Sequence, residues 1–264
     1  MATGEVYPSA PLALVVAEVR YPPVSDSALT MPVYRRIRDQ LGGSWVIHNA
    51  TSQTIEAGVD VSGPRASLRS EKFSRITSRE RTRIITAKPE SFIVEVVDYL
   101  RFPDFQNLLV LAAQAVENVL QPDGIVRIGL RYINEIPAPE QPPEWSHWLD
   151  RSLTAPELPR QLTLTDWTGT ARYQVSADQF LVLQYRPSAG PVVSPEGPLR
   201  RPRVTEGPIF VLDFDSFWQP DDIPEFTSDR IGEVADSLHS PLRGLFDSLC
   251  QPSLLEEFRK DRSP

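Results

Sequence analysis

The sequence predicts an α+β fold of two related halves, in which helices pack on one side of curved antiparallel sheets. Three observations predict it. Apolar runs that alternate with polar residues recur along the chain, and proline or glycine separates them. Two longer segments instead repeat their apolar residues with helical spacing. The order of these patterns in the first half recurs in the second, which indicates an internal repeat.

The first half is expected to span residues 1–123 and to open with a strand followed by a helix. The run LALVVAEVRY (12–21) lies between prolines and is rich in valine, which favours a strand. The following TMPVYRRIRDQL has one apolar face at helical spacing, with Thr30 as a candidate N-cap and Pro32 in the first turn.

An antiparallel meander and a long helix are expected to complete this half. The segments SWVIHNATSQTIEAGV, EKFSRITS, RTRIITAKP and SFIVEVVDY are largely alternating, and polar or turn residues separate them. The period then changes in DFQNLLVLAAQAVENVL (104–120), whose apolar residues fall on one helical stripe. Asp104 is a plausible N-cap for this helix.

The second half, residues 124–264, is expected to repeat this order. Its opening strand is IVRIGLRYINEI (125–136), followed by the short helical candidate EWSHWLDRSL, further alternating strands and a terminal helical pattern at 228–249. Ser240 and Pro241 are expected to divide that last pattern, because serine caps a helix and proline is favoured in a first turn.

Two short matches support the repeat. AEVRY (17–21) aligns with IGLRY (128–132), and FIVEVVDY (92–99) resembles FVLDFDSF (210–217), which sets Glu95 against Asp213. The matches occur in the same order, and that agreement is the evidence. Ferredoxin-like and TATA-binding-protein-like arrangements are the nearest architectural analogies, with the two sheets joined through their opening strands. Such an analogy does not by itself imply DNA binding.

The strand at 125–136 carries the most unusual residues. Because side chains alternate across a strand, Arg127, Gly129 and Arg131 are expected on one face and Asn134 on the other. Gly129 leaves room between the arginines for another group. Two interpretations remain open: the arginines bind an anion or an acidic peptide, or they pair with carboxylates of neighbouring strands.

Carboxylates that suit the second interpretation lie in apolar, strand-like surroundings, where an ionised group needs partners to offset its desolvation. Arg20 and Arg131 are the expected donors, since arginine binds carboxylates in a bidentate geometry. Asn134 is a candidate ligand- or partner-binding residue together with Arg20, Arg127 and Arg131, and the alternative is that it secures a strand end or a loop. The predicted structural partners are Glu18, Glu95, Asp213 and Asp215.

A further candidate binding segment is the proline- and glycine-rich stretch at 186–208. It contains Arg200, Arg201 and Arg203 and has no apolar period. Long irregular segments are often binding loops. The alternative is a solvated hairpin connection.

Several function classes lack the residues they need. Cys250 is the single cysteine, so it excludes a thiolate metal cluster and is expected to be a small buried hydrophobe. His48, His147 and His239 belong to no metal or triad signature, and the glycine-rich phosphate loops and the G-x-S-x-G pattern do not occur. The sequence therefore predicts no catalytic residue, metal or cofactor, and an enzyme is disfavoured.

Charge and hydropathy limit the partners. A net charge of −8 argues against broad attachment to nucleic acid, which depends on neutralised phosphates, although a local basic groove is compatible with it. No stretch approaches the roughly 18 consecutive apolar residues of a membrane helix, and the first residues lack the basic region and cleavage site of a signal peptide. A cytoplasmic protein is expected.

The segments PLALVVAEVRY, FIVEVVDY, IGLRYIN and VLDFD together resemble a sporadically distributed bacterial protein family of uncharacterised activity that shares a Gly-Leu-Arg-Tyr-Ile-Asn core motif. The similarity spans nearly the whole chain, and GLRYIN is its most specific element. The resemblance implies a shared two-part design and a patchy inheritance, as in mobile or conflict-associated genes. It implies no activity and transfers no catalytic residue.

The function expected from these observations is a non-enzymatic cytoplasmic binding or regulatory module. It would hold a protein partner on the concave sheet or the proline-rich loop, as an accessory or immunity component of a mobile or defence-associated locus. One alternative is an enzyme or small-ligand binder with a polar pocket between the halves, which predicts a water-filled cavity containing Arg20 and Arg131. The second alternative is nucleic-acid binding across the sheet, and the sequence does not indicate an oligomeric state.

Overall fold

The computed structural model describes residues 7–25, 29–60, 63–138, 140, 142–154, 164 and 166–260, and these form an α+β fold around one antiparallel sheet. The nine strands lie in the order β2-β3-β4-β5-β1-β6-β9-β8-β7. The strands are β1 (Leu12–Arg20), β2 (Trp45–Asp60), β3 (Gly63–Ser78), β4 (Arg83–Ala87), β5 (Ser91–Val96), β6 (Arg127–Pro137), β7 (Gly169–Gln174), β8 (Gln179–Ser188) and β9 (Ile209–Trp218).

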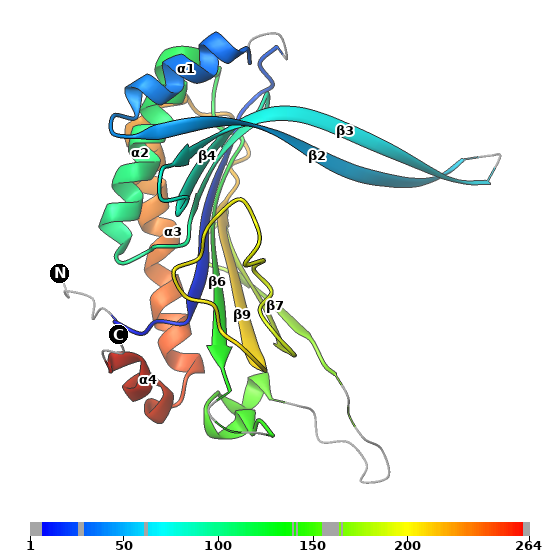
Figure 1. Cartoon of the computed structure of the whole chain (residues 1–264), viewed down its shortest axis with the longest axis vertical. Coiled ribbons are helices and arrows are strands. Elements are labelled where there is room, and N and C mark those ends of the chain that lie inside the picture. Colours follow the sequence, from blue (N-terminus) through cyan, green and yellow to red (C-terminus); the bar gives the residue numbers. More distant parts are fainter. Residues whose placement is uncertain are drawn as a thin grey trace.

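One face of the sheet is covered by helices, and Figure 1 shows α1, α2 and α3 side by side along it. Their buried residues, such as Ile37, Leu109 and Leu238, belong to one hydrophobic core that also contains strand residues from both parts of the chain. The helices are α1 (Met31–Gln40), α2 (Phe102–Leu120), α3 (Ser228–Leu249) and α4 (Pro252–Arg259). We call the opposite face of the sheet the helix-free face.

The prediction that the two parts of the sheet join through their opening strands is confirmed. Strands β1 and β6 pair in an antiparallel register that sets Glu18 opposite Gly129 and Arg20 opposite Arg127. Outward from this seam the order is β5-β4-β3-β2 on one side and β9-β8-β7 on the other. The positions on either side of residue 123 thus share one sheet and one core.

The expected strand-helix-meander-helix order is not reproduced in the second half. Between β6 and β7, the described residues contain only two 3-10 helices, η2 (Trp145–His147) and η3 (Arg151–Leu153), where the first half has α1. The short helical candidate there is thus two separate turns. The positions 155–163 lie outside the described residues.

Two predicted helix ends were wrong. Helix α3 runs through Ser240 and Pro241 without a break, because Leu238 and Leu242 on either side are buried in the core and their packing offsets the hydrogen bond that proline removes. Helix α2 begins at Phe102 with Arg101 as N-cap, so Asp104 lies in the first turn. A carboxylate there still interacts favourably with the helix dipole.

Strands β2 and β3 extend far beyond the rest of the sheet. Both have 16 residues, but β3 pairs with β4 only from Arg75 to Thr77. The remaining residues, 49–60 of β2 and 63–74 of β3, form a two-stranded ribbon that we call the arm. The arm projects away from the helices (Figure 1). Among the described helices, none is long and apolar enough to cross a membrane.

A segment between β8 and β9, residues 189–208, lies over the helix-free face, and we call it the strap (yellow in Figure 1). Leu199 of the strap is 7% exposed and packs with Ile84 and Val97. Val192 and Val193 pack in a second small cluster that contains Ile133 and Val211. The strap therefore connects adjacent strands, as a hairpin connection does; many of its residues are exposed, while Leu199, Val192 and Val193 attach it to the sheet.

Candidate functional site: the helix-free face

The strand β6 divides its residues between the two faces as the alternation predicts. Ile128, Leu130 and Tyr132 lie in the core beneath the helices. The residues between them therefore face the other way, onto the helix-free face. The helix-free residues of β6 are Arg127, Gly129, Arg131, Ile133 and Glu135.

Arg131 is held by a carboxylate of the neighbouring strand. Its Nε donates to Oδ1 of Asp213 at 2.8 Å and its Nη2 to Oδ2 at 2.6 Å, a bidentate pair. These hydrogen bonds raise the pKa of the Arg131 guanidinium. The Arg131 side chain is 49% exposed, so the pair lies at the surface and not in a packed interior.

Arg127 lies deeper and makes contacts on three sides. Its Nη2 donates to Oδ2 of Asp215 at 3.1 Å, and its Nη1 lies 3.5 Å from Oε2 of Glu18. Its guanidinium lies over the ring of Phe217, 4.5 Å from the centroid. A Cβ at Gly129 would lie 2.5 Å from Arg127 Nη1, so the missing side chain is what makes room for this guanidinium.

Glu18 and Asp215 complete this group of charges. Arg20 Nε donates to Glu18 Oε2 at 2.9 Å, so Glu18 lies between two arginines. Burial raises the pKa of the Asp215 carboxyl, and the charges of Arg127 and Arg131 partly offset that effect. The arrangement is a network of ion pairs along the seam of the sheet.

Glu95 does not make the ion pair predicted for it, since none of the described residues brings a cationic nitrogen within 4.0 Å of its carboxylate. The register explains why: Glu95 and Arg131 both lie opposite Val16, on its two sides. They are therefore two strand spacings apart, roughly 9.6 Å. Burial raises the pKa of Glu95, and the charges of Arg75 and Lys88 oppose that rise.

The strand register also disagrees with the sequence alignment that matched Glu95 with Asp213 in the repeat. Strand β5 places Ser91 opposite Arg20, and β9 places Asp215 opposite Arg131. If Arg20 is equivalent to Arg131, then Ser91 is equivalent to Asp215. The alignment of FIVEVVDY with FVLDFDSF sets Glu95 against Asp213, and it is therefore out of register with the sheet.

The strap is fixed by a buried ion pair that sequence reasoning missed. Arg201 Nη2 donates to Glu135 Oε2 at 2.6 Å, and the two side chains are 4% and 1% exposed. The other oxygen of Glu135 accepts from the backbone N–H groups of Val192 and Val193, both at 2.8 Å. Glu135 follows Arg131 and Ile133 in the alternation of β6, which is the signal that could have found it.

The other arginines predicted for this loop point to the surface. Arg200 is exposed, and its backbone N–H donates to the carbonyl of Arg81 at 2.6 Å. Arg81 Nε in turn donates to the carbonyl of Pro198 at 3.1 Å. Arg203 is also exposed. The strap therefore uses Arg201 internally, and these contacts tie it to the turn between β3 and β4.

Beyond the strap, the helix-free face is open and carries a stack of rings and guanidinium groups. The rings of Phe180 and Phe217 lie 5.5 Å apart, and the Arg172 guanidinium lies 4.5 Å from the Phe180 centroid. Arg127 covers Phe217 from the other direction. We call Arg172, Phe180, Phe217 and Arg127 the aromatic ladder; both rings are half-buried and Arg172 is exposed.

The open end of the face carries charges of both signs. Its arginines lie over rings or bind carboxylates, and the partly buried Glu95 carboxylate lies near Arg75 and Lys88. The cationic residues are Arg20, Arg75, Arg127, Arg131 and Arg172, with Lys88 close enough to act on Glu95, and the anionic residues are Glu18, Glu95, Asp213 and Asp215. This surface offers aromatic and planar cationic groups with carboxylates among them.

On the helix side, Tyr132 of the GLRYIN motif joins a small polar cluster. Its hydroxyl lies 3.1 Å from His239 Nδ1 and 3.4 Å from the Tyr99 hydroxyl. His239 stacks on Phe102 with centroids 4.0 Å apart, and burial lowers the pKa of the imidazole to about 4. Asn134 is buried on this side and donates to the Leu212 carbonyl at 3.2 Å, which secures β6 to β9.

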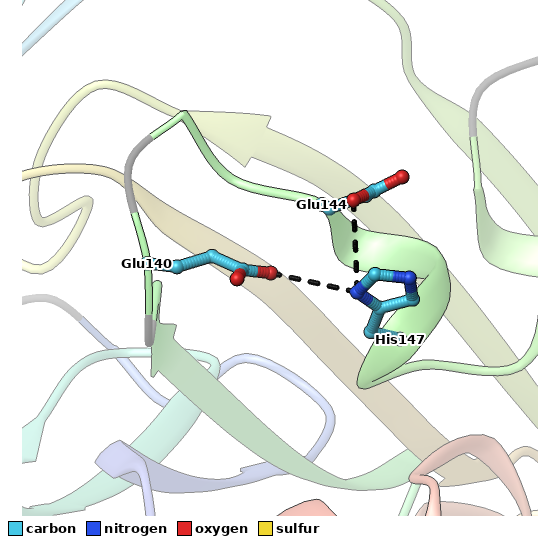
Figure 2. Close-up of side chains that lie close together, drawn as sticks. All are labelled: Glu140, Glu144 and His147. Carbon is cyan, nitrogen blue, oxygen red and sulfur yellow. Dashed lines mark ion pairs between the residues drawn. The ribbon is translucent and has the colours of Figure 1, made fainter.

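One group of side chains has the composition of a metal site. Glu140, Glu144 and His147 bring their ligand atoms within 4.8 Å of one another, and Figure 2 shows both carboxylates directed at the same ring nitrogen. The distances from His147 Nδ1 to the carboxylate oxygens are 3.6 and 3.7 Å. All three side chains are 47–65% exposed, so water competes with a metal for these groups. The cluster is therefore better explained as surface contacts between the imidazole and two carboxylates.

A polar hollow of about 330 Å³ lies between the end of α1 and the start of β2. Arg38, Asp39, Trp45 and Arg79 line it, and none of the central arginines does. Arg38 is already paired with Asp39 at 2.6 Å. The hollow therefore does not correspond to the polar pocket between the halves that the small-ligand interpretation requires.

A scan against protein-family models matched none over this chain, and a search of curated proteins found no relative. The resemblance based on GLRYIN thus stays a hypothesis, and the functional argument depends on the geometry of the helix-free face.

Proposed function

We propose that this protein is a non-enzymatic binding module and that the open end of its helix-free face holds a protein partner. The observation that carries the proposal is the aromatic ladder. Its two half-buried phenylalanine rings lie between arginines on a face that no described helix covers. Aromatic residues and arginine are the types most enriched among energetically dominant interface residues.

The pairing of the charges favours a protein over nucleic acid as the partner. Carboxylates lie among the arginines at the open end, and Arg20, Arg127 and Arg131 each contact one. Binding to a phosphate backbone draws most of its affinity from unneutralised cations that displace counterions. Arginines that already contact carboxylates, on a chain of net charge −8, provide little of that contribution.

Enzymatic chemistry has less support among the described residues. Burial raises the pKa of the Cys250 thiol to about 12, which disfavours the reactive thiolate. His239 is buried against Phe102 and Tyr132 in a helix-sheet contact. A small-ligand site remains the alternative function, but the central guanidinium groups are engaged by carboxylates that a ligand would have to displace.

The proposal also includes the two-part design. The strands on either side of the β1–β6 seam follow the same outward order, and Glu18 lies opposite Gly129, the position with which it aligns in the repeat. A TATA-binding-protein-like arrangement of two related halves is consistent with this pattern. With the family resemblance, this leads us to propose a cytoplasmic bacterial accessory or immunity component of a mobile or defence-associated locus.

The test is site-specific photo-crosslinking in cells that naturally make the protein. A photoreactive phenylalanine analogue replaces Phe180 in the full chain, and the matched control carries it at Arg36, which is exposed on α1. We expect a discrete crosslinked protein from position 180 that nuclease treatment does not remove. Identical products from both positions, or nuclease-sensitive products alone, would overturn the proposal.

A second variant keeps that test specific. Phe217→Ser removes one ring of the aromatic ladder, while Ile223→Ser changes a 60% exposed apolar residue of the loop after β9. Loss of the crosslink from position 180 in the first variant and its retention in the second is the expected result. Equal loss in both variants would show that the aromatic ladder does not determine binding.

A further inference from the structure

The arm is a long ribbon with two unpaired edges. From Gly63 to Ser74, β3 has β2 as its partner on one side and no described strand on the other. No described strand pairs with the outer edge of β2 either. At about 3.4 Å per residue, these twelve positions extend roughly 40 Å. Figure 1 shows the ribbon well clear of the helices and of the remaining strands.

Such a ribbon needs a partner for physical reasons. An isolated two-stranded ribbon is at best marginally stable in water, and three or more strands are needed for independent stability. Its edges also present rows of unpaired N–H and C=O groups, which are a template for another strand. The opposite sheet edge, β7, has only six residues and carries the exposed Arg172, as protected edges do.

The sequence alternates between apolar and polar residues in the outer part of the arm, residues 55–60 and 63–68. The register pairs Ile55 with Leu68 and Ala57 with Ala66. The positions between them are glycine, polar or charged. Over residues 55–60 and 63–68 one set of positions is therefore apolar and the other is glycine, polar or charged, which is the pattern of a strand pair that belongs to a larger sheet.

The charge of the arm fits a second copy of this chain. Between positions 49 and 74 the three acidic residues Glu56, Asp60 and Glu71 balance the three basic residues Arg65, Arg69 and Lys72. Two arms therefore meet without net repulsion, although the whole chain has a charge of −8. The arm also lacks the positive excess that a nucleic-acid partner would require.

The β3 edge is self-complementary. If β3 pairs antiparallel with β3 of a second copy about Leu68, Arg65 lies opposite Glu71 of the second copy, and the reciprocal pair forms by symmetry. Leu68 then lies opposite its own copy. The charged residues of β2 on the arm, Glu56 and Asp60, are both acidic, so this edge offers no such complementarity.

We propose that the arm is a dimerisation element, in which the β3 edges of two copies join to form a continuous four-stranded ribbon with two-fold symmetry. This contact is isologous and closes on itself, so it yields a dimer and not a filament. It uses a different surface from the aromatic ladder, which stays available for the protein partner.

The test measures the association state of the full chain by sedimentation over a concentration series. Arg65→Glu and Glu71→Arg each place like charges opposite each other twice in the dimer, and each is expected to weaken dimerisation about tenfold. Within the chain the register sets Arg65 opposite Gly58 and Glu71 opposite Ser52, so neither substitution is made at a position directly opposite a charged residue of β2. The variant with both substitutions exchanges the charges and is expected to restore the dimer.

Glu56→Arg is the matched control, because it changes a charge on β2, outside the β3 contact. It is expected to leave the dimer unchanged, and the melting temperature of each variant reports on folding. A chain that stays monomeric at every concentration overturns the proposal. So does a dimer that ignores the two single substitutions, or one that the exchanged variant does not restore.

Discussion

The two ends of the helix-free face use the same chemical pair in opposite ways. Under the strap, Glu135 of β6 binds Arg201 with both side chains almost fully buried. At the open end, Arg131 of the same strand binds Asp213, and its side chain is half exposed. The closest distance is 2.6 Å in both pairs. Distance therefore does not distinguish them, and burial does.

Burial changes what each pair contributes. Two charges removed from water incur a large desolvation cost, which their attraction offsets only while both partners remain, so loss of one partner is strongly destabilising. An exposed pair is solvated in either state and contributes little. The strap end is therefore part of the architecture, while the half-exposed Arg131 pair at the open end contributes little to stability.

The largest expected effect is at the strap. Glu135→Ala leaves the Arg201 guanidinium and two backbone N–H groups buried without their acceptor. We expect it to lower the free energy of unfolding by about 3–5 kcal/mol, measured by urea denaturation at pH 7. The double variant Glu135→Met with Arg201→Met should regain much of this loss. A loss below 1 kcal/mol for the single variant would mean that the strap is not fixed as described.

The second prediction concerns the helix side of the same strand, where burial lowers the pKa of His239 to about 4. As the pH falls through about 6.5, His239 of the unfolded chain takes up a proton, while His239 of the folded protein stays neutral. Its contribution to the free energy of unfolding is therefore full above pH 6.5 and is lost as the pH decreases toward 4. We expect protonation of His239 in the unfolded chain to lower the free energy of unfolding by about 2 kcal/mol between pH 7.5 and pH 4.5.

The comparison variant for this prediction is His239→Phe, which keeps an aromatic ring against Phe102. Its unfolding free energy, measured across the same pH range, should depend on pH less steeply than that of the unmodified protein. Parallel pH profiles for the two proteins would show that His239 does not titrate as proposed.

The third prediction applies to the open end. A double-mutant cycle with Arg131→Ala and Asp213→Ala should give a coupling of about 0.2–1 kcal/mol, because one partner is half solvated. Salt at about 1 M should reduce this coupling, since the Debye length falls to about 3 Å. The same cycle on Glu135 and Arg201 should change far less with salt. Equal salt dependence in both cycles would remove the distinction between the two ends.

The smallest expected effect is a gain in stability. Glu95 is partly buried at the open end without an ion pair, and burial raises the pKa of its carboxyl. Glu95→Gln removes the charge while it keeps the size and shape of the side chain. We expect a slightly higher melting temperature at pH 7, where the ionised form is the costly one. A lower melting temperature would indicate that the charges of Arg75 and Lys88 outweigh the desolvation.

Local patterns account for most of what could be predicted. Alternation placed Arg127 and Arg131 on one face of β6 and Tyr132 on the other, and helical spacing located α1 and α2. Pro241 is the clearest failure, because a proline that usually ends a helix is carried through α3 by core packing on both sides. Propensity acts over a few residues, whereas that packing depends on contacts with the sheet.

The candidate site shows the same limit. The sequence indicated that strand arginines need carboxylates, but not which carboxylate lies on the adjacent strand. The register chose Asp213 for Arg131 and left Glu95 one strand too far away. The partnership of Glu135 with Arg201 depends on how the strap crosses the sheet, and no sequence spacing predicts that crossing.

The sequence by itself determined the α+β class, the two faces of each strand and the positions of the charged residues along them, because these follow from periods of 2 and 3.6 residues. The tertiary structure alone decided which pairs are buried, which face stays open and where the long β2–β3 ribbon ends without a neighbour. Those outcomes depend on strand register and on contacts between distant segments, which local periodicity does not encode.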